Sequence, residues 1–86
     1  MTLVGTSLVL WRSLDGTPER FVVDGRRYRV TDNPTPLEFD TALITHLDAV
    51  PTGWRLQGTD EAGESLMFDI GRFGVDRDWQ VLRTYR

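Results

Sequence analysis

The segment from Arg20 to Val30 constrains the fold of this chain more than any other stretch. At its centre is Asp24-Gly25, a dipeptide that favours a two-residue type I′ turn because both positions of that turn need positive φ. A turn at this point makes the segment a β-hairpin in which Phe21 lies opposite Tyr28. The chain is therefore expected to contain an antiparallel sheet built outward from this hairpin.

The two faces of the hairpin differ in chemistry, since side chains alternate between faces along a strand. The register places Arg20 directly opposite Arg29, and like charges in that position are unfavourable. The basic face therefore needs an anionic neighbour, either on another strand or on a separate molecule. The apolar face holds Phe21, Val23, Tyr28 and Val30, and the basic face holds Arg20, Val22, Arg27 and Arg29.

Length and composition predict one small globular domain that spans residues 1–86. A chain of this size can bury one modest core. No apolar run approaches the roughly 18 residues of a membrane span, and the apolar segment 3–11 lacks a basic leader, which favours a core strand over a signal peptide. Cysteine is absent, which excludes disulfides and thiolate zinc ligands. We therefore expect a cytoplasmic protein with no membrane partner.

Turn signals divide the rest of the chain into further short strands. The loop Asp60-Glu61-Ala62-Gly63 favours a type I turn that ends in a left-handed glycine, which makes a second hairpin. In the last strand we expect Trp79, Val81 and Tyr85 to share one side. Besides the two arms of the first hairpin, the expected strands cover residues 3–12, 54–59, 64–70 and 79–85.

A single short helix, residues 36–50, is predicted between the third and fourth strands. Thr35 and Glu38 have the spacing of a capping box, and Pro36 occupies the expected first helical position. An apolar stripe with helical period follows, and Pro51 is a stop signal. The predicted fold is mainly β (α+β): a small curled antiparallel sheet or SH3-like barrel of about six strands with one helix. The stripe consists of Phe39, Leu43, Leu47 and Val50.

No motif for catalysis or metal binding is complete. His46 is the one histidine and has no recognisable partner, so we predict a surface or boundary position for it. Asp76 and Asp78 lack the longer ligand series of a calcium loop and are typical of a turn. The run Gly71-Arg72-Phe73-Gly74 matches the GXXG of KH domains, but that loop lies between helices and this one joins strands. We predict no enzyme activity, no metal and no cofactor.

The aromatic residues offer a further reading, because aromatic side chains can stack on single-stranded bases. Alternation assigns them instead to the inward positions that a small core needs, and each can bury roughly 150–250 Å². Core packing is therefore the stronger prediction. The residues concerned are Tyr28, Trp54, Phe68 and Trp79.

The candidate binding residues are Arg20, Arg27 and Arg29, extended by Arg55 or Arg83 on other strands. Guanidinium groups suit phosphates and carboxylates. The alternative is structural, and in it these arginines pair with acidic residues of a neighbouring strand. All ten basic residues are arginine, which codon bias in a GC-rich genome explains more simply than function. The acidic candidates are Asp32, Glu64 and Asp69.

Several motifs resemble a family of small actinobacterial proteins classed as an uncharacterised domain. They are Gly16-x-Pro18-x-x-Phe21-x-Val23-x-Gly25-Arg26-x-Tyr28-x-Val30 and the later segments 54–56, 68–70 and 78–85. The resemblance implies no catalytic residue. Because some relatives are encoded near error-prone DNA-repair polymerases, it implies an accessory role in DNA repair.

The sequence favours a non-enzymatic cytoplasmic domain that binds another protein. The alternative is a single-stranded nucleic-acid-binding accessory domain that uses the arginine-rich hairpin face and is linked to DNA repair. The net charge of −3 argues against a general nucleic-acid binder, because such domains are usually strongly basic. Partner identity, oligomeric state and strand order stay open.

Overall fold

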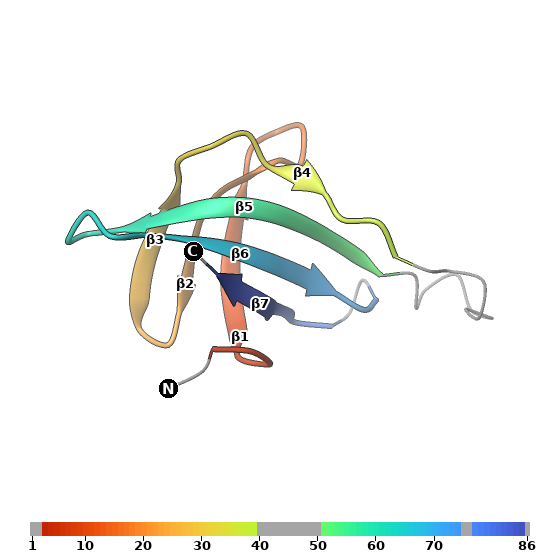
Figure 1. The fold of residues 1–86 in the computed structure, drawn as a ribbon. Coiled ribbons are helices and arrows are strands. Elements are labelled where there is room, and N and C mark those ends of the chain that lie inside the picture. The colour runs from red at the N-terminus through yellow and green to blue at the C-terminus, as the bar shows by residue number, and fades with distance from the viewer. Residues whose placement is uncertain (1–2, 40–50, 75–76, 86) are drawn as a thin grey trace.

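The computed structural model describes residues 3–39, 51–74 and 77–85, and these form seven β-strands. The strands are β1 (Ser7–Arg12), β2 (Pro18–Val23), β3 (Arg26–Val30), β4 (Thr35–Pro36), β5 (Thr52–Asp60), β6 (Ser65–Arg72) and β7 (Trp79–Tyr85). Neighbouring strands are antiparallel, and the order β1-β2-β3-β5-β6-β7 closes on itself because β1 pairs with β7 and β3 pairs with β5 (Figure 1). The short β4 lies beside β5. The predicted mainly β barrel of about six strands is confirmed.

The first hairpin has the predicted turn and register. Asp24 and Gly25 have φ angles of 51° and 73°, as a type I′ turn requires. Phe21 pairs with Tyr28 and Arg20 pairs with Arg29. The turn chemistry of two residues has therefore fixed which side chains of β2 and β3 point inward.

The second hairpin, β5–β6, is also confirmed. The Gly63 N–H donates to the Asp60 carbonyl oxygen at 3.0 Å, and Gly63 has a φ of 84°. Thr59 then pairs with Ser65 across the start of the hairpin. Leu56 of β5 and Phe68 of β6 consequently face the barrel interior, where both are fully buried.

The core contains the aromatic residues that were alternative stacking platforms. The rings of Phe21 and Tyr28 are stacked with centroids 5.1 Å apart, and Phe68 meets them edge-on at 4.9 Å and 5.0 Å. Trp79 is buried and Trp54 is half-buried against the same cluster. Core packing is thus the observed role of these rings. The buried apolar residues are Leu8, Phe21, Val23, Tyr28, Leu56, Phe68, Ile70, Trp79 and Val81.

The predicted helix start is wrong, because Thr35 and Pro36 form β4 instead. They pair with Arg55 and Trp54 of β5, and the Leu37 N–H donates to a β5 carbonyl oxygen at 2.9 Å. A residue before proline disfavours the α region, and proline is tolerated in an edge strand. Residues 37–39 are not helical, and positions 40–50 lie outside the described residues. Within the described ranges no helix could span a membrane.

A β-bulge in β7 changes the predicted face of Tyr85. Ile70 of β6 pairs with Val81 while the preceding residue, Asp69, pairs with Arg83, so Leu82 is an extra residue. An extra residue reverses the alternation beyond it. Tyr85 therefore lies on the outer face with Asp69 rather than on the inner side with Val81.

Candidate arginine-rich interaction site

One row of side chains crosses the outside of the barrel at right angles to its strands. The pairings Trp11–Arg20, Arg20–Arg29, Arg29–Thr59 and Thr59–Ser65 run in sequence from β1 to β6. With a strand spacing of about 4.8 Å, this row is about 19 Å long. It presents one aromatic ring, then two guanidinium groups, then two hydroxyl groups to solvent.

A second, shorter row lies beside the first. Val9 pairs with Val22, and Val22 pairs with Arg27. We define the arginine face as the outward side chains of Trp11, Arg20, Val22, Arg27 and Arg29. These residues line an open hollow of about 910 Å³ over β2 and β3. The sequence prediction that Arg20, Arg27 and Arg29 share one face is thus confirmed.

The three arginines of this face have no carboxylate partner in the part of the chain that the structure describes. No described Asp or Glu oxygen lies within 4.0 Å of their guanidinium groups. Arg20 instead lies over the Trp11 ring, 4.9 Å from its centroid, in cation–π geometry. Arg27 and Arg29 are exposed. The arrangement concentrates positive charge on a chain whose net charge is −3.

The acidic residues considered as partners for these arginines interact elsewhere. Asp69 pairs with Arg55, and the Asp32 carboxylate accepts the Gln57 backbone N–H at 2.9 Å. Glu64 acts electrostatically on Arg26. Within the described residues, the arginines of the arginine face are therefore not paired with acidic residues of a neighbouring strand.

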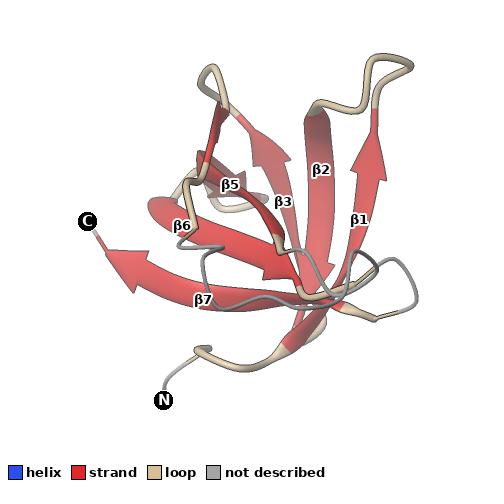
Figure 2. Cartoon of the chain, turned by 90° about the vertical axis from the view of Figure 1, so that its right-hand side faces the viewer, coloured by secondary structure: helices blue, strands red, loops and turns tan. Residues whose placement is uncertain are grey.

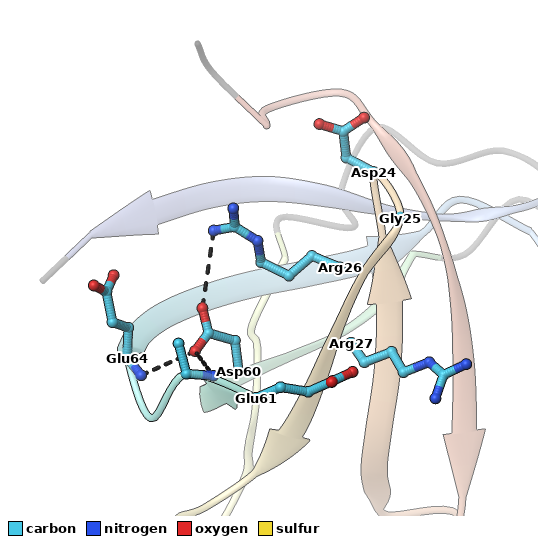
Figure 3. Close-up of a pocket in the computed structure, with 8 residues that line it drawn as sticks. Asp24, Gly25, Arg26, Arg27, Asp60, Glu61 and Glu64 are labelled. Atoms are coloured by element: carbon cyan, nitrogen blue, oxygen red, sulfur yellow. Dashed lines mark hydrogen bonds and ion pairs between the residues drawn. The ribbon is translucent and has the colours of Figure 1, made fainter.

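The tips of the two hairpins form one end of the face. Arg26 reaches toward Asp60, with 3.9 Å between Nη1 and Oδ2, whereas Arg27 points the other way across β2 (Figure 3). The pKa of Arg26 is raised mainly by a hydrogen bond to Tyr28, and the negative charge of Asp60 raises it further. Arg26 therefore has anionic and polar partners of its own, and Glu61 lines the same end.

Neutral polar groups continue the face toward β6. The Thr31 hydroxyl donates to Gln57 Oε1 at 3.0 Å and lies 2.8 Å from the Thr59 hydroxyl. The Thr59 hydroxyl in turn lies 2.7 Å from the Ser65 hydroxyl. This chain of exposed hydroxyl and amide groups provides hydrogen-bonding capacity next to Arg29 without adding charge.

Arg55 and Arg83 do not extend the arginine face. Arg55 donates to both oxygens of the buried Asp69, at 2.9 Å and 3.2 Å, and the Tyr85 hydroxyl donates to the same carboxylate at 3.3 Å. Arg83 lies 5.5 Å from the Tyr85 ring centroid. Partial burial raises the pKa of Tyr85, and the Asp69 charge raises it further. These residues form a separate cluster on β5, β6 and β7.

The other sequence motifs do not form a site. Gly71 and Arg72 belong to β6 rather than to a loop between helices, and Arg72 covers the Trp79 ring at 4.9 Å. His46 and Asp76 lie outside the described residues. Among the residues that are described, no group of three or more His, Cys, Asp or Glu could hold a metal ion.

Sequence reasoning missed Trp11 as a member of the face. Its position on the face depends on the register between β1 and β2, and this register shifts by one residue between the pairs Trp11–Arg20 and Arg12–Pro18. The only signal for this position in the sequence was that Val9 and Trp11 are two residues apart, which places both side chains on the same face of a strand. Comparison of the chain with protein-family models, curated proteins and solved structures finds no match.

Proposed function

We propose that this chain is a non-enzymatic, cytoplasmic protein-interaction domain whose arginine face binds an acidic segment of another protein. The observation that carries the proposal is the direct opposition of Arg20 and Arg29, with Arg27 beside them and no described carboxylate within 4.0 Å. Such an arrangement costs stability. A bound anionic segment would remove that cost and form charge-assisted hydrogen bonds with the guanidinium groups.

The surroundings of the face favour a protein over a nucleic acid. Val9 is 58% exposed and Trp11 is 41% exposed, and with Val22 they offer an apolar strip suited to aliphatic side chains. Asp60 and Glu61 stand at one end of the hollow, where they would repel a continuous phosphate backbone. A peptide can place its acidic residues on the arginines and neutral residues beside these two carboxylates.

The proposal is tested with two fluorescein-labelled probes of equal charge. One is a peptide in which glutamate alternates with leucine, and the other is a single-stranded oligothymidylate. Binding is measured by fluorescence anisotropy at low and at physiological salt. We expect the peptide to bind more tightly than the DNA, with an affinity that falls as salt rises because exposed charges are screened.

Two variants identify the surface that binds. Arg29→Ala should weaken peptide binding by roughly tenfold, in line with the loss of one charge-assisted contact. Arg83→Ala removes the same charge from the Asp69 cluster and should leave binding unchanged. Tighter binding of the DNA would refute the proposal and support the alternative, in which the arginine face binds single-stranded nucleic acid. Absence of peptide binding at low salt, or equal loss in both variants, would refute the proposal.

A further inference from the structure

β1 has an open edge along its second half. It pairs with β7 only at Ser7 and Leu8, whereas its pairing with β2 continues to Arg12. In Figure 2, β1 rises at the side of the barrel while β7 runs away from it, so the two strands diverge. From Val9 to Arg12, no described strand lies on the side of β1 opposite β2.

The pairing pattern identifies which backbone groups point toward this edge. In an antiparallel ladder, alternate residues direct both their N–H and C=O groups to the same neighbour. The turn at 24–25 directs Val23 and Phe21 to β3, so Val22 and Arg20 bond to Val9 and Trp11 of β1. The N–H and C=O groups of Leu10 and Arg12 therefore face away from β2. Among the described residues, no strand pairs with Leu10 or Arg12 on that side, and no backbone hydrogen bond outside the strand ladders involves them.

The side chains along the open edge do not protect it. Edge strands are commonly blocked by lysine, proline or inward-pointing charges. Here Val9 and Trp11 are large, apolar and exposed on the outer face. The one charged residue, Arg12, is exposed at the end of the edge rather than buried in the interior, and its guanidinium carbon lies 5.7 Å from the Trp79 ring centroid. A strand with these properties is suited to pairing with another strand.

We propose that the open edge of β1 pairs with β1 of a second copy of this chain, around a two-fold axis through Trp11. In this register, Leu10 of each copy exchanges two hydrogen bonds with Arg12 of the other, and Trp11 lies opposite its counterpart. The open backbone groups of Leu10 and Arg12 are then hydrogen-bonded in both copies. The strand pairing uses Trp11 of the arginine face but not Arg27 or Arg29, so a failure of the dimer and a failure of peptide binding are distinguishable.

Self-complementarity favours a second copy as the occupant. Leu10 and Arg12 are separated by a single residue. A two-fold axis through that residue therefore pairs Leu10 of each copy with Arg12 of the other and leaves no backbone group of the open edge unpaired. The Arg20 residues of the two copies are three strand spacings apart, about 14 Å, and their repulsion is largely screened. The contact is small, so a weak and concentration-dependent dimer is expected.

Sedimentation equilibrium and amide hydrogen exchange test the proposal on the full chain. Up to roughly 0.5 mM, where weak interfaces of this size associate, we expect a reversible monomer–dimer equilibrium. Over the same range the Leu10 and Arg12 amides should exchange roughly two- to fivefold more slowly. A monomer at the highest concentration overturns the proposal. So does a dimer whose Leu10 and Arg12 amides exchange as in the monomer, including one formed with a different surface.

Two matched pairs of variants separate strand pairing from general effects. Trp11→Glu places two like charges opposite each other and should abolish the dimer, whereas Ala62→Glu adds the same charge on the exposed β5–β6 turn and should not. Arg12→Pro removes an edge N–H, whereas Arg12→Ala keeps it. Both variants lose the arginine side chain, so Arg12→Pro should weaken the dimer more than Arg12→Ala does. Circular dichroism verifies that each variant folds, and equal behaviour within both pairs would overturn the proposal.

Discussion

Arg29 is expected to destabilise the folded protein, so Arg29→Thr should stabilise it. Arg29 lies directly opposite Arg20, and Arg27 is two residues away on the same strand and the same face. No described carboxylate within 4.0 Å offsets either repulsion. Threonine also suits an exposed strand position. The substitution removes two repulsive pairs at once.

The magnitude follows from Coulomb's law with screening. Two unit charges about 7 Å apart in water repel by about 0.6 kcal/mol. Screening leaves roughly four-fifths of this at 0.01 M salt, less than half at 0.15 M and about a tenth at 1 M. For two pairs, Arg29→Thr should raise the free energy of unfolding by about 1 kcal/mol at low salt and about 0.5 kcal/mol at physiological salt. The second figure corresponds to roughly 2–4 °C in the melting temperature.

Urea denaturation at these three salt concentrations measures the effect. The salt-dependent part of the gain isolates the charge repulsion, because the strand preference of threonine does not change with salt. Arg83→Thr is the matched control, since Arg83 lies opposite Asp69 and over Tyr85. It changes net charge equally and should lower stability at low salt. Destabilisation by Arg29→Thr at low salt would refute the reasoning and show that the folded protein neutralises Arg29.

Three further predictions concern packing and titration. A Cβ atom at Gly58 would lie 2.8 Å from Phe21 Cζ and 3.0 Å from Phe68 Cε2, so Gly58→Ala should cost about 1–3 kcal/mol in urea denaturation; an unchanged midpoint would contradict the tight aromatic packing. The hydrogen bond from the Ser13 hydroxyl, together with that from the Thr17 N–H, lowers the pKa of Asp15 to about 2. Its contribution to stability is therefore present above the ordinary pKa of 3.8 and is lost as pH falls toward 2. NMR titration of the Asp15 carboxyl should show this low midpoint, and Ser13→Ala should raise it. Partial burial and the Asp69 charge raise the pKa of Tyr85 above 10.0, so its contribution is present below pH 10 and is lost as pH rises through the folded pKa. Asp69→Asn should lower that pKa in an NMR titration of the Tyr85 ring, and an unchanged value would argue against their contact.

The sequence predicted the parts of this fold that are determined locally. The dipeptide Asp24-Gly25 and the loop 60–63 each specify a turn through the φ angles that their residues adopt, and a turn sets the register of the strands beside it. Period-two alternation then assigned Phe21, Tyr28 and Phe68 to the core. The same local rules placed the three arginines together on one face, which is why that part of the candidate site was predictable.

The helix start failed because two local signals competed. Thr35, Pro36 and Glu38 have helix-start spacing, but the same two residues also suit an extended segment before and at proline. Hydrogen bonding to β5 decided between them in favour of β4. The face of Tyr85 failed for a related reason, since the bulge at Leu82 arises from the pairing of β7 with β6 and has no local sequence signal.

By itself, then, the sequence determined the two hairpins, the alternation that fills the core and the shared face of Arg20, Arg27 and Arg29, because each depends on residues close together in the chain. The tertiary structure alone decided that Trp11 joins that face, that Asp32 and Asp69 interact elsewhere, and that β1 is left with an open edge. These features depend on which distant strands meet and in what register. That choice is made by the packing of the closed barrel, which no local pattern encodes.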